Sequence, residues 1–120
     1  MTMIVDLKSP LREDFNIVTQ RLTSTQAWQF NRRCILVSTR TIPPGSNAEI
    51  LAGGFDMAGL PLNCRIYFDF DQLRSKTHSY IQGVIAHEIG HVLNQWVHVS
   101  VYQSELDADE FAARLGFFRR

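Results

Sequence analysis

The sequence of 120 residues has no long apolar run, only two cysteines and no excess of either charge. No apolar stretch reaches the ~18–20 residues that a helix needs to cross a bilayer. Twelve basic residues balance twelve acidic ones, so the charge favours neither nucleic acid nor an anionic membrane as a partner. The N-terminal MTMIVDLKSP lacks the apolar core of a signal peptide. We therefore expect a soluble, cytoplasmic protein without a membrane span.

The two cysteines, Cys34 and Cys64, both fall in predicted strands, and neither has metal-ligand spacing. A disulfide between neighbouring strands is one outcome, and a pair of buried free thiols is the outcome expected in a reducing compartment. The length fits one domain, residues 1–120, and 45% hydrophobic residues are ordinary for a globular chain.

The most informative stretch runs from Ile81 to Trp96 and reads IQGVIAHEIGHVLNQW. It contains an H-E-x-x-H motif at His87, Glu88 and His91. Residues four apart lie on one face of an α-helix, so the two imidazoles can hold one zinc ion at ~2.0–2.1 Å. Glu88 lies one step round the helix, where its carboxylate can act as general base on a metal-bound water. The competing interpretation is a core helix with two hydrogen-bonded histidines.

A catalytic zinc site usually has three protein ligands, and a second predicted helix offers the third. This helix is expected from Glu105 to Leu115, with Ser104 as its N-cap. Glu105 would complete a His₂Glu set. Asp109, four residues later on the same face, can accept the free N–H of a ligand histidine. Alternatively, both acids are ordinary first-turn residues favoured by the helix dipole.

His98 is the other candidate for the third ligand. Metzincin peptidases extend the motif to H-E-x-x-H-x-x-G-x-x-H. In this chain Asn94 stands in the glycine position, and the histidine comes one residue late, after Val97. In a continuing helix, His98 would lie ~10.5 Å beyond His91 along the axis. The pattern therefore favours Glu105 over His98.

The remaining elements are predicted from periodicity and turn residues. Residues 23–31, in which Trp28 and Phe30 alternate with polar neighbours, are left open between an edge strand and a loop. Two glycines, Gly53 and Gly54, weaken a strand expected between Ala48 and Met57. The clearer elements are a short strand or anchoring segment at 3–7, a scaffold helix at 10–22, and strands at 34–42 and 64–70.

The two motifs together, AHEIGHVLNQW and SELDADEFAARLGF, resemble those of the gluzincins. The second motif is similar to the Glu-x-x-Ala-Asp-x-x-Ala of the CAAX-prenyl-protease and HtpX type, through Glu105, Ala108, Asp109 and Ala112. Those proteases are mostly membrane-embedded, and the short chain is closer to the minigluzincins, compact soluble proteins of which some are latent. The resemblance implies Glu105 as zinc ligand and Asp109 as its companion outside the ligand set.

Together, pattern and resemblance predict an α+β, zincin-like fold. It comprises a small mixed sheet, a backing helix, a metal-binding helix and a C-terminal helix that carries Glu105. The predicted function is that of a zinc metalloendopeptidase acting on a peptide or protein substrate. The strand at 64–70 would be the edge strand that holds an extended substrate, as in other zinc peptidases. The alternative is a non-proteolytic zinc-binding regulatory or interaction module.

Two questions stay open at this point. The oxyanion donor is undecided among His98, Tyr102 and Arg114. The terminal aromatics, Phe117 and Phe118, are costly to leave in water at ~25 cal/mol per Å² of apolar surface. They are expected to pack either against the core or into the substrate cleft, and the second arrangement would make the enzyme latent.

Overall fold

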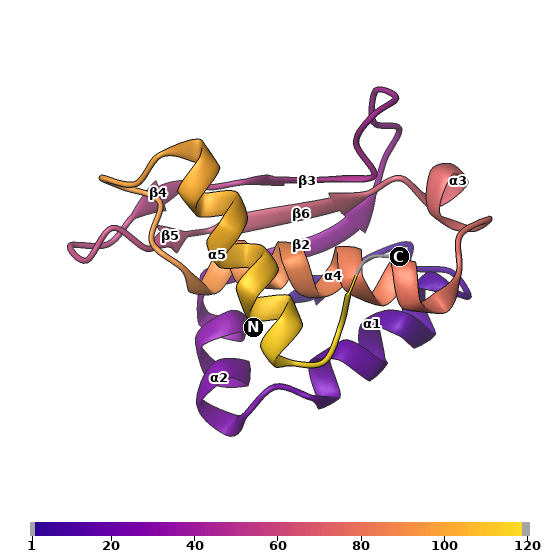
Figure 1. Cartoon of the computed structure of the whole chain (residues 1–120), viewed down its shortest axis with the longest axis horizontal. Helices are drawn as coiled ribbons and strands as arrows, with labels where there is room; N and C mark the ends of the chain where they lie inside the picture. The colour runs from indigo at the N-terminus through magenta and orange to yellow at the C-terminus, as the bar shows by residue number, and fades with distance from the viewer. Residues whose placement is uncertain (1, 119–120) are drawn as a thin grey trace.

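The structure is a computed structural model that describes residues 2–118, and it has the expected α+β architecture (Figure 1). A four-stranded mixed sheet and a separate two-stranded hairpin are combined with five helices within the described residues. The strands are β1 (Met3–Ile4), β2 (Cys34–Thr39), β3 (Ala48–Leu51), β4 (Gly54–Phe55), β5 (Pro61–Leu62) and β6 (Cys64–Phe68). The helices are α1 (Leu11–Gln20), α2 (Ser24–Arg33), α3 (Phe70–Leu73), α4 (His78–Leu93) and α5 (Val101–Arg114).

The four-stranded sheet has the order β1-β2-β6-β3. β1, β2 and β6 are parallel, and β3 is antiparallel to β6. The strand predicted at 64–70 is therefore β6, but its assignment as an edge strand is wrong, because β6 pairs on both sides. The sequence pattern identifies a strand with one buried face, in which buried Ile66 and Phe68 alternate with Arg65 and Tyr67. This pattern carries no information about which strands pair with it. The two edges of the sheet belong to β1 and β3.

The metal-motif helix α4 forms the middle layer of the molecule. Figure 1 shows it between the sheet on one side and α1 on the other, with α5 crossing it. Its apolar residues, including Ile81, Ile85 and Ile89, are fully buried in the core. The helix begins at His78 because the Thr77 side chain caps it by accepting the Tyr80 N–H. Because α4 is packed on several sides, the helix that carries the motif is held in one position relative to the rest of the fold.

Residues 23–31 form most of a helix, α2, and the edge strand or loop considered for them is wrong. Thr23 and Gln26 make a reciprocal capping box, in which each side chain accepts the other residue's backbone N–H. Trp28 remains 57% exposed whereas Phe30 is buried, which is helical amphipathicity rather than strand alternation.

The last helix starts one turn earlier than predicted. Ser100, not Ser104, is its N-cap and accepts the backbone N–H of Gln103. The connector expected over residues 97–103 therefore already contains the first turn of α5. As a result, Ser104 and Glu105 lie inside the helix, with their directions set by its geometry. Gly116 has a φ of +92° just after the helix, as expected of a glycine at that position.

The cysteines and the C-terminal aromatics take the simpler of their expected arrangements. Cys34 and Cys64 are register partners on β2 and β6, and both are buried free thiols. Burial raises the pKa of Cys34 to about 12 and that of Cys64 to about 11, so neither is a reactive thiolate. Phe117 joins the core beneath the Arg21 guanidinium, and Phe118 is 51% exposed. Residues 119 and 120 of the predicted tail lie outside the described residues.

No helix within residues 2–118 has both the length and the apolar character needed to cross a lipid bilayer.

Candidate metal centre

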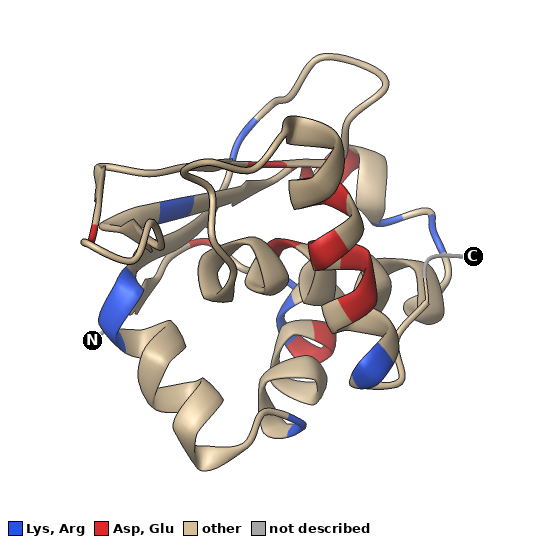
Figure 2. Ribbon diagram, turned by 60° about the vertical axis from the view of Figure 1, so that its left-hand side comes forward, with Lys and Arg blue, Asp and Glu red and all other residues tan. Residues whose placement is uncertain are grey.

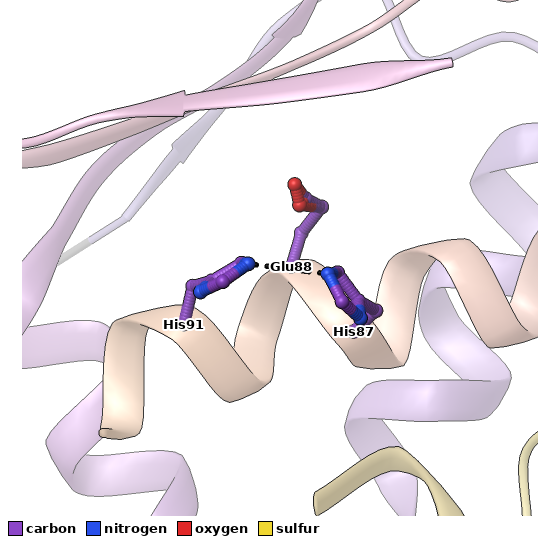
Figure 3. Close-up of side chains that lie close together, drawn as sticks. All are labelled: His87, Glu88 and His91. Atoms are coloured by element: carbon purple, nitrogen blue, oxygen red, sulfur yellow. Dashed lines mark hydrogen bonds between the residues drawn. The ribbon is translucent and has the colours of Figure 1, made fainter. Parts of the chain in front are cut away.

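The three motif residues of α4 form a buried group that could hold a metal ion. His87, Glu88 and His91 are only 5%, 6% and 6% exposed, and each offers one ligand atom within 4.8 Å of the others. The Nε2 atoms of the two histidines are 3.1 Å apart. Figure 3 shows one nitrogen of each ring directed toward the other, while the Glu88 carboxylate rises from the helix toward the sheet. The spacing of the motif therefore produces the expected shared face.

Glu105 approaches this group from α5. Its Oε2 is 2.7 Å from His87 Nε2, and its Oε1 is 3.4 Å from His91 Nε2. In tetrahedral zinc sites with bonds of ~2.0–2.1 Å, neighbouring ligand atoms lie roughly 3.3 Å apart. The two nitrogens and the carboxylate of Glu105 therefore converge on one point at nearly that separation. Glu105 is also the most accessible of the three, with a side chain that is 54% exposed.

Asp109 lies on the other side of the His87 ring, with its Oδ1 2.7 Å from His87 Nδ1. A carboxylate can only accept, so His87 donates its Nδ1–H to Asp109. In a neutral imidazole this leaves a lone pair on Nε2, which faces Glu105 and His91. A carboxylate and two imidazole nitrogens that meet in this way favour a cation between them, because a single proton cannot satisfy three acceptors.

The surroundings of His91 fix its ring in a comparable way. Its Nδ1 is 3.3 Å from Ser104 Oγ, and its backbone carbonyl accepts the Trp96 Nε1–H at 2.7 Å. Burial, followed by the nearby His87, lowers the pKa of His91, while Glu105 acts in the opposite direction. A neutral imidazole is the form that binds metal, so this environment keeps His91 ready to act as a ligand.

The contact between α4 and α5 depends on Gly90. A Cβ at this position would lie 3.0 Å from both the Cα and the carbonyl oxygen of Ala108, and 3.1 Å from Phe111 Cβ. Only glycine therefore lets the two helices approach this closely. Because Ala108 lies between Glu105 and Asp109 in the sequence, the contact at Gly90 sets how far these two acids stand from the histidines.

A cavity of about 190 Å³ opens beside Glu88. It is bounded by the segment that leads into β3, by α4 and by Glu105. Its walls include Ser46, Asn47 and Tyr80, and the Asn47 side-chain amide donates to the Tyr80 hydroxyl at 2.5 Å. Polar groups that can hold a ligand thus lie next to the candidate metal group.

The helix α5 is rich in acidic residues, and two of them, Glu105 and Asp109, face the histidines. Figure 2 shows several acidic residues, coloured red, along this helix. Four of the fourteen residues of α5 are Asp or Glu, namely Glu105, Asp107, Asp109 and Glu110. A concentration of negative charge next to buried imidazoles favours cation binding. The donor set and its electrostatic environment both fit a zinc ion.

The structure brings some predicted residues together and leaves others apart. His98 is exposed in the turn between the helices, with a φ of +67°, and lies outside the buried group that could hold a metal. Tyr102 is 63% exposed, and the side chain of Arg114 is 77% exposed and pairs with Glu110. Among the described contacts, none of the three residues reaches the histidines.

Sequence reasoning missed the supporting roles of Ser104 and Tyr80. Ser104 was assigned as a helix cap, and that assignment concealed its contact with His91. Tyr80 lies seven residues before His87, two turns away on the same helix face, and this periodicity could have identified it. Asn47 carried no local signal, since only the tertiary fold brings it to Tyr80.

Comparisons with protein-family models, with curated proteins and with solved structures found no match to this chain.

Proposed function

We propose that this protein is a zinc-dependent metallopeptidase of the gluzincin type, with a zincin-like fold. In this proposal His87, His91 and Glu105 are the zinc ligands, Glu88 is the general base and Asp109 orients His87. The observation that carries the proposal is the convergence of Nε2 of both histidines and the Glu105 carboxylate, with separations between 2.7 and 3.4 Å. A single hydrogen bond between a core histidine and an acid would not require both Nε2 atoms to approach the same carboxylate, so this convergence supports a metal-binding role.

A bound zinc ion would polarise the scissile carbonyl and lower the pKa of its water to around 7. The protein's part is to place the groups. Glu88, buried beside the cavity, would accept a proton from the attacking water and deliver it to the leaving amine. Asp109 would keep the His87 proton on Nδ1 and so keep its Nε2 lone pair available. Low exposure around Glu88 strengthens these electrostatic interactions.

Metal content and peptide cleavage on the same sample test the proposal. We expect about one zinc per chain, loss of that zinc in a His87→Ala/His91→Ala variant, and hydrolysis of some members of a peptide library. A chelator should stop the hydrolysis, and added zinc should restore it. Stoichiometric metal in the double variant would overturn the ligand assignment, and absence of cleavage by the zinc-loaded protein would overturn the peptidase assignment.

The second candidate is a non-proteolytic zinc-binding module with the same ligands. The cavity beside Glu88, about 190 Å³, favours it, because ligand pockets usually measure ~300–1,000 Å³. This candidate predicts full zinc occupancy without hydrolysis of any library member. Binding of a peptide without cleavage would identify an interaction module.

A further inference from the structure

Two contacts join residues 47–55 to α4 and to the residues that follow it, one on either side of the candidate metal centre. Asn47 meets Tyr80 at one end of this pairing, and Phe55 meets Trp96 at the other, with ring centroids 5.7 Å apart. The chain from Asn47 to Phe55, which contains β3 and β4, can span at most roughly 26 Å, and the part of α4 from Tyr80 to Leu93 spans roughly 20 Å. The two segments therefore run in the same direction and at the same scale, with the histidines between their ends.

The Asn47 end is polar. The cavity there is walled by Ser46, Asn47 and Tyr80 together with Glu88 and Glu105. The Tyr80 hydroxyl accepts from Asn47, so its own proton is left to donate. A substrate side chain that enters from this side meets hydrogen-bonding groups.

The Phe55 end is aromatic. Phe55 is 46% exposed although it contacts Trp96, so part of its ring is available to a ligand. Trp96 in turn lies edge-on to the His91 ring, with centroids 6.2 Å apart. An extended peptide advances ~3.3 Å per residue, so this aromatic pair, Phe55 and Trp96, lies within about two residues of the candidate metal centre.

The aromatic pair is held in place by backbone contacts. The N–H of Trp96 donates to the Gly59 carbonyl, and the Gln95 side chain donates to Ala58, which ties the end of α4 to the hairpin. Gly59 has a φ of +83° and approaches Gln95 closely, so the hairpin turn itself depends on this glycine. A surface held in this way can bind an apolar group without a large cost of ordering.

Charge is nearly absent from both segments that carry the aromatic pair. Residues 92–104 contain no Asp, Glu, Lys or Arg, and residues 50–63 contain only Asp56. Asp56 is paired with Arg33 at 2.8 Å and accepts two backbone N–H groups of its own turn. The aromatic end therefore presents an apolar surface with no free charge of its own.

We propose that the surface between these two ends binds a peptide as a two-ended cleft, which selects a large apolar side chain at the Phe55–Trp96 end and a small hydrogen-bonding side chain at the Asn47–Tyr80 end. The scissile bond would lie between them, and this part rests on the proposed peptidase function. The two classes of side chain are separated because each end suits only one of them. A polar group against Phe55 loses its hydrogen bonds with water, and an apolar group beside Tyr80 leaves the Tyr80 hydroxyl proton without an acceptor.

Binding measured without turnover tests the proposal. The zinc-loaded Glu88→Gln variant is titrated by calorimetry with capped hexapeptides that carry Phe or Ser on either side of the central bond. Burying a phenylalanine contributes ~1.5–3 kcal/mol, so one placement of Phe should bind about tenfold or more tightly than its Ser counterpart. In the Glu88→Gln/Phe55→Ala double variant, the ratio of the affinities for the Phe and Ser peptides should fall to about threefold or less.

The other end and a matched control are tested in the same background. Tyr80→Phe keeps the ring, removes the donor and should weaken the peptide with a polar residue on that side about two- to tenfold, with the Phe preference intact. Trp28→Ala removes an exposed aromatic of α2 that lines neither end and should change nothing. Zinc content is measured for every variant, so that a lost metal is not mistaken for lost contact.

The outcomes separate the two proposals. A Phe preference that persists in the Phe55→Ala background, or no measurable peptide binding, overturns the two-ended cleft. Hydrolysis by the parent protein without side-chain preference also overturns it, while the peptidase proposal stands. Selective binding that depends on Phe55, in a protein whose parent cleaves none of the peptides, supports the cleft and overturns the peptidase.

Discussion

Glu88 is a buried carboxylate whose proposed role can be separated from metal binding. Glu88→Gln keeps the size of the side chain and removes its ability to take a proton. We expect unchanged zinc content and a fall in the hydrolysis rate on the order of 10²–10⁴-fold, the usual contribution of a general base. Parallel metal analysis and single-turnover kinetics check this. The control is Glu110→Gln, on the exposed part of α5, and a parent-like rate in Glu88→Gln would exclude Glu88 as the base.

In the proposed function Asp109 acts through His87 rather than on the metal itself, and this role predicts a different effect of substitution. Without its carboxylate, the His87 ring loses the acceptor that fixes its Nδ1 proton. We expect Asp109→Ala to weaken zinc binding about 10–100-fold, with Asp109→Asn in between, because the amide oxygen can still accept. Competition with a metal chelator measures the affinity. Asp107→Ala, two residues away, should leave it unchanged, and equal losses in both variants would indicate a general charge effect.

At the scale of elements, the contact between α4 and α5 can be tested by one methyl group. Alanine is favoured over glycine inside a helix by ~1 kcal/mol, so Gly90→Ala should stabilise an isolated α4. In the folded protein the added Cβ meets the backbone of Ala108 at 3.0 Å, which cannot move without shifting α5. We expect a lower melting temperature and weaker zinc binding, as Glu105 is displaced.

Gly54→Ala provides the matched comparison for Gly90→Ala. A Cβ there meets nothing within 4 Å, so the same chemical change adds no contact. Differential scanning calorimetry and zinc titration of both variants give the difference. If Gly90→Ala is as stable as Gly54→Ala and binds zinc equally well, the helix contact does not set the position of Glu105.

The elements that the sequence predicts well are those defined by local signals. The helix with the H-E-x-x-H motif and the strands β2 and β6 were identified because their periodicity reports burial directly. The path of α2 was missed because two aromatics, Trp28 and Phe30, happen to alternate, although Thr23 and Gln26 carried the capping signal. The start of α5 was misplaced because Ser100 and Ser104 both precede plausible first turns.

What the sequence cannot provide is which distant segments become neighbours. β6 lies between β2 and β3. Its position in the sheet depends on these two partner strands, and no local pattern in the sequence of β6 identifies them. The same holds for Asn47 beside Tyr80 and for Phe55 beside Trp96, where neither residue carries a signal of its partner. The proposed metal ligands are the exception, because the chemistry of two motifs implied a meeting between helices.

At the scale of the whole molecule, a carboxylate and an imidazole limit stability from opposite sides of the pH range. The backbone N–H of Ile42, followed by the Gln72 side chain, lowers the pKa of Asp69, so its stabilising contribution is present above the unfolded value of ~3.9 and is lost as the pH falls. The hydrogen bond from His78 to Asp14 raises the pKa of His78. That contribution is complete below ~6.5 and is lost as the pH rises through the raised value.

Urea unfolding of the metal-free protein across pH 3 to 9 checks both contributions. The difference in unfolding free energy between the parent and Asp69→Asn should shrink toward acid, and that between the parent and His78→Gln should shrink toward alkali. The difference in unfolding free energy for His78→Gln should be small and salt-sensitive, because the His78 side chain is 71% exposed. A difference for His78→Gln that grows with pH would contradict the assigned partner.

The close contact between α4 and α5 has a consequence for the kinetics of folding. Three of the four sheet strands and α4 lie within residues 34–93, whereas Glu105 reaches the histidines only after α5 has docked. We expect the ligand set to be incomplete in the folding transition state. Zinc should therefore slow unfolding and leave the refolding rate nearly unchanged, which stopped-flow measurements with and without the metal would detect. Faster refolding in zinc would mean instead that the two helices pair early and that the metal helps to nucleate the fold.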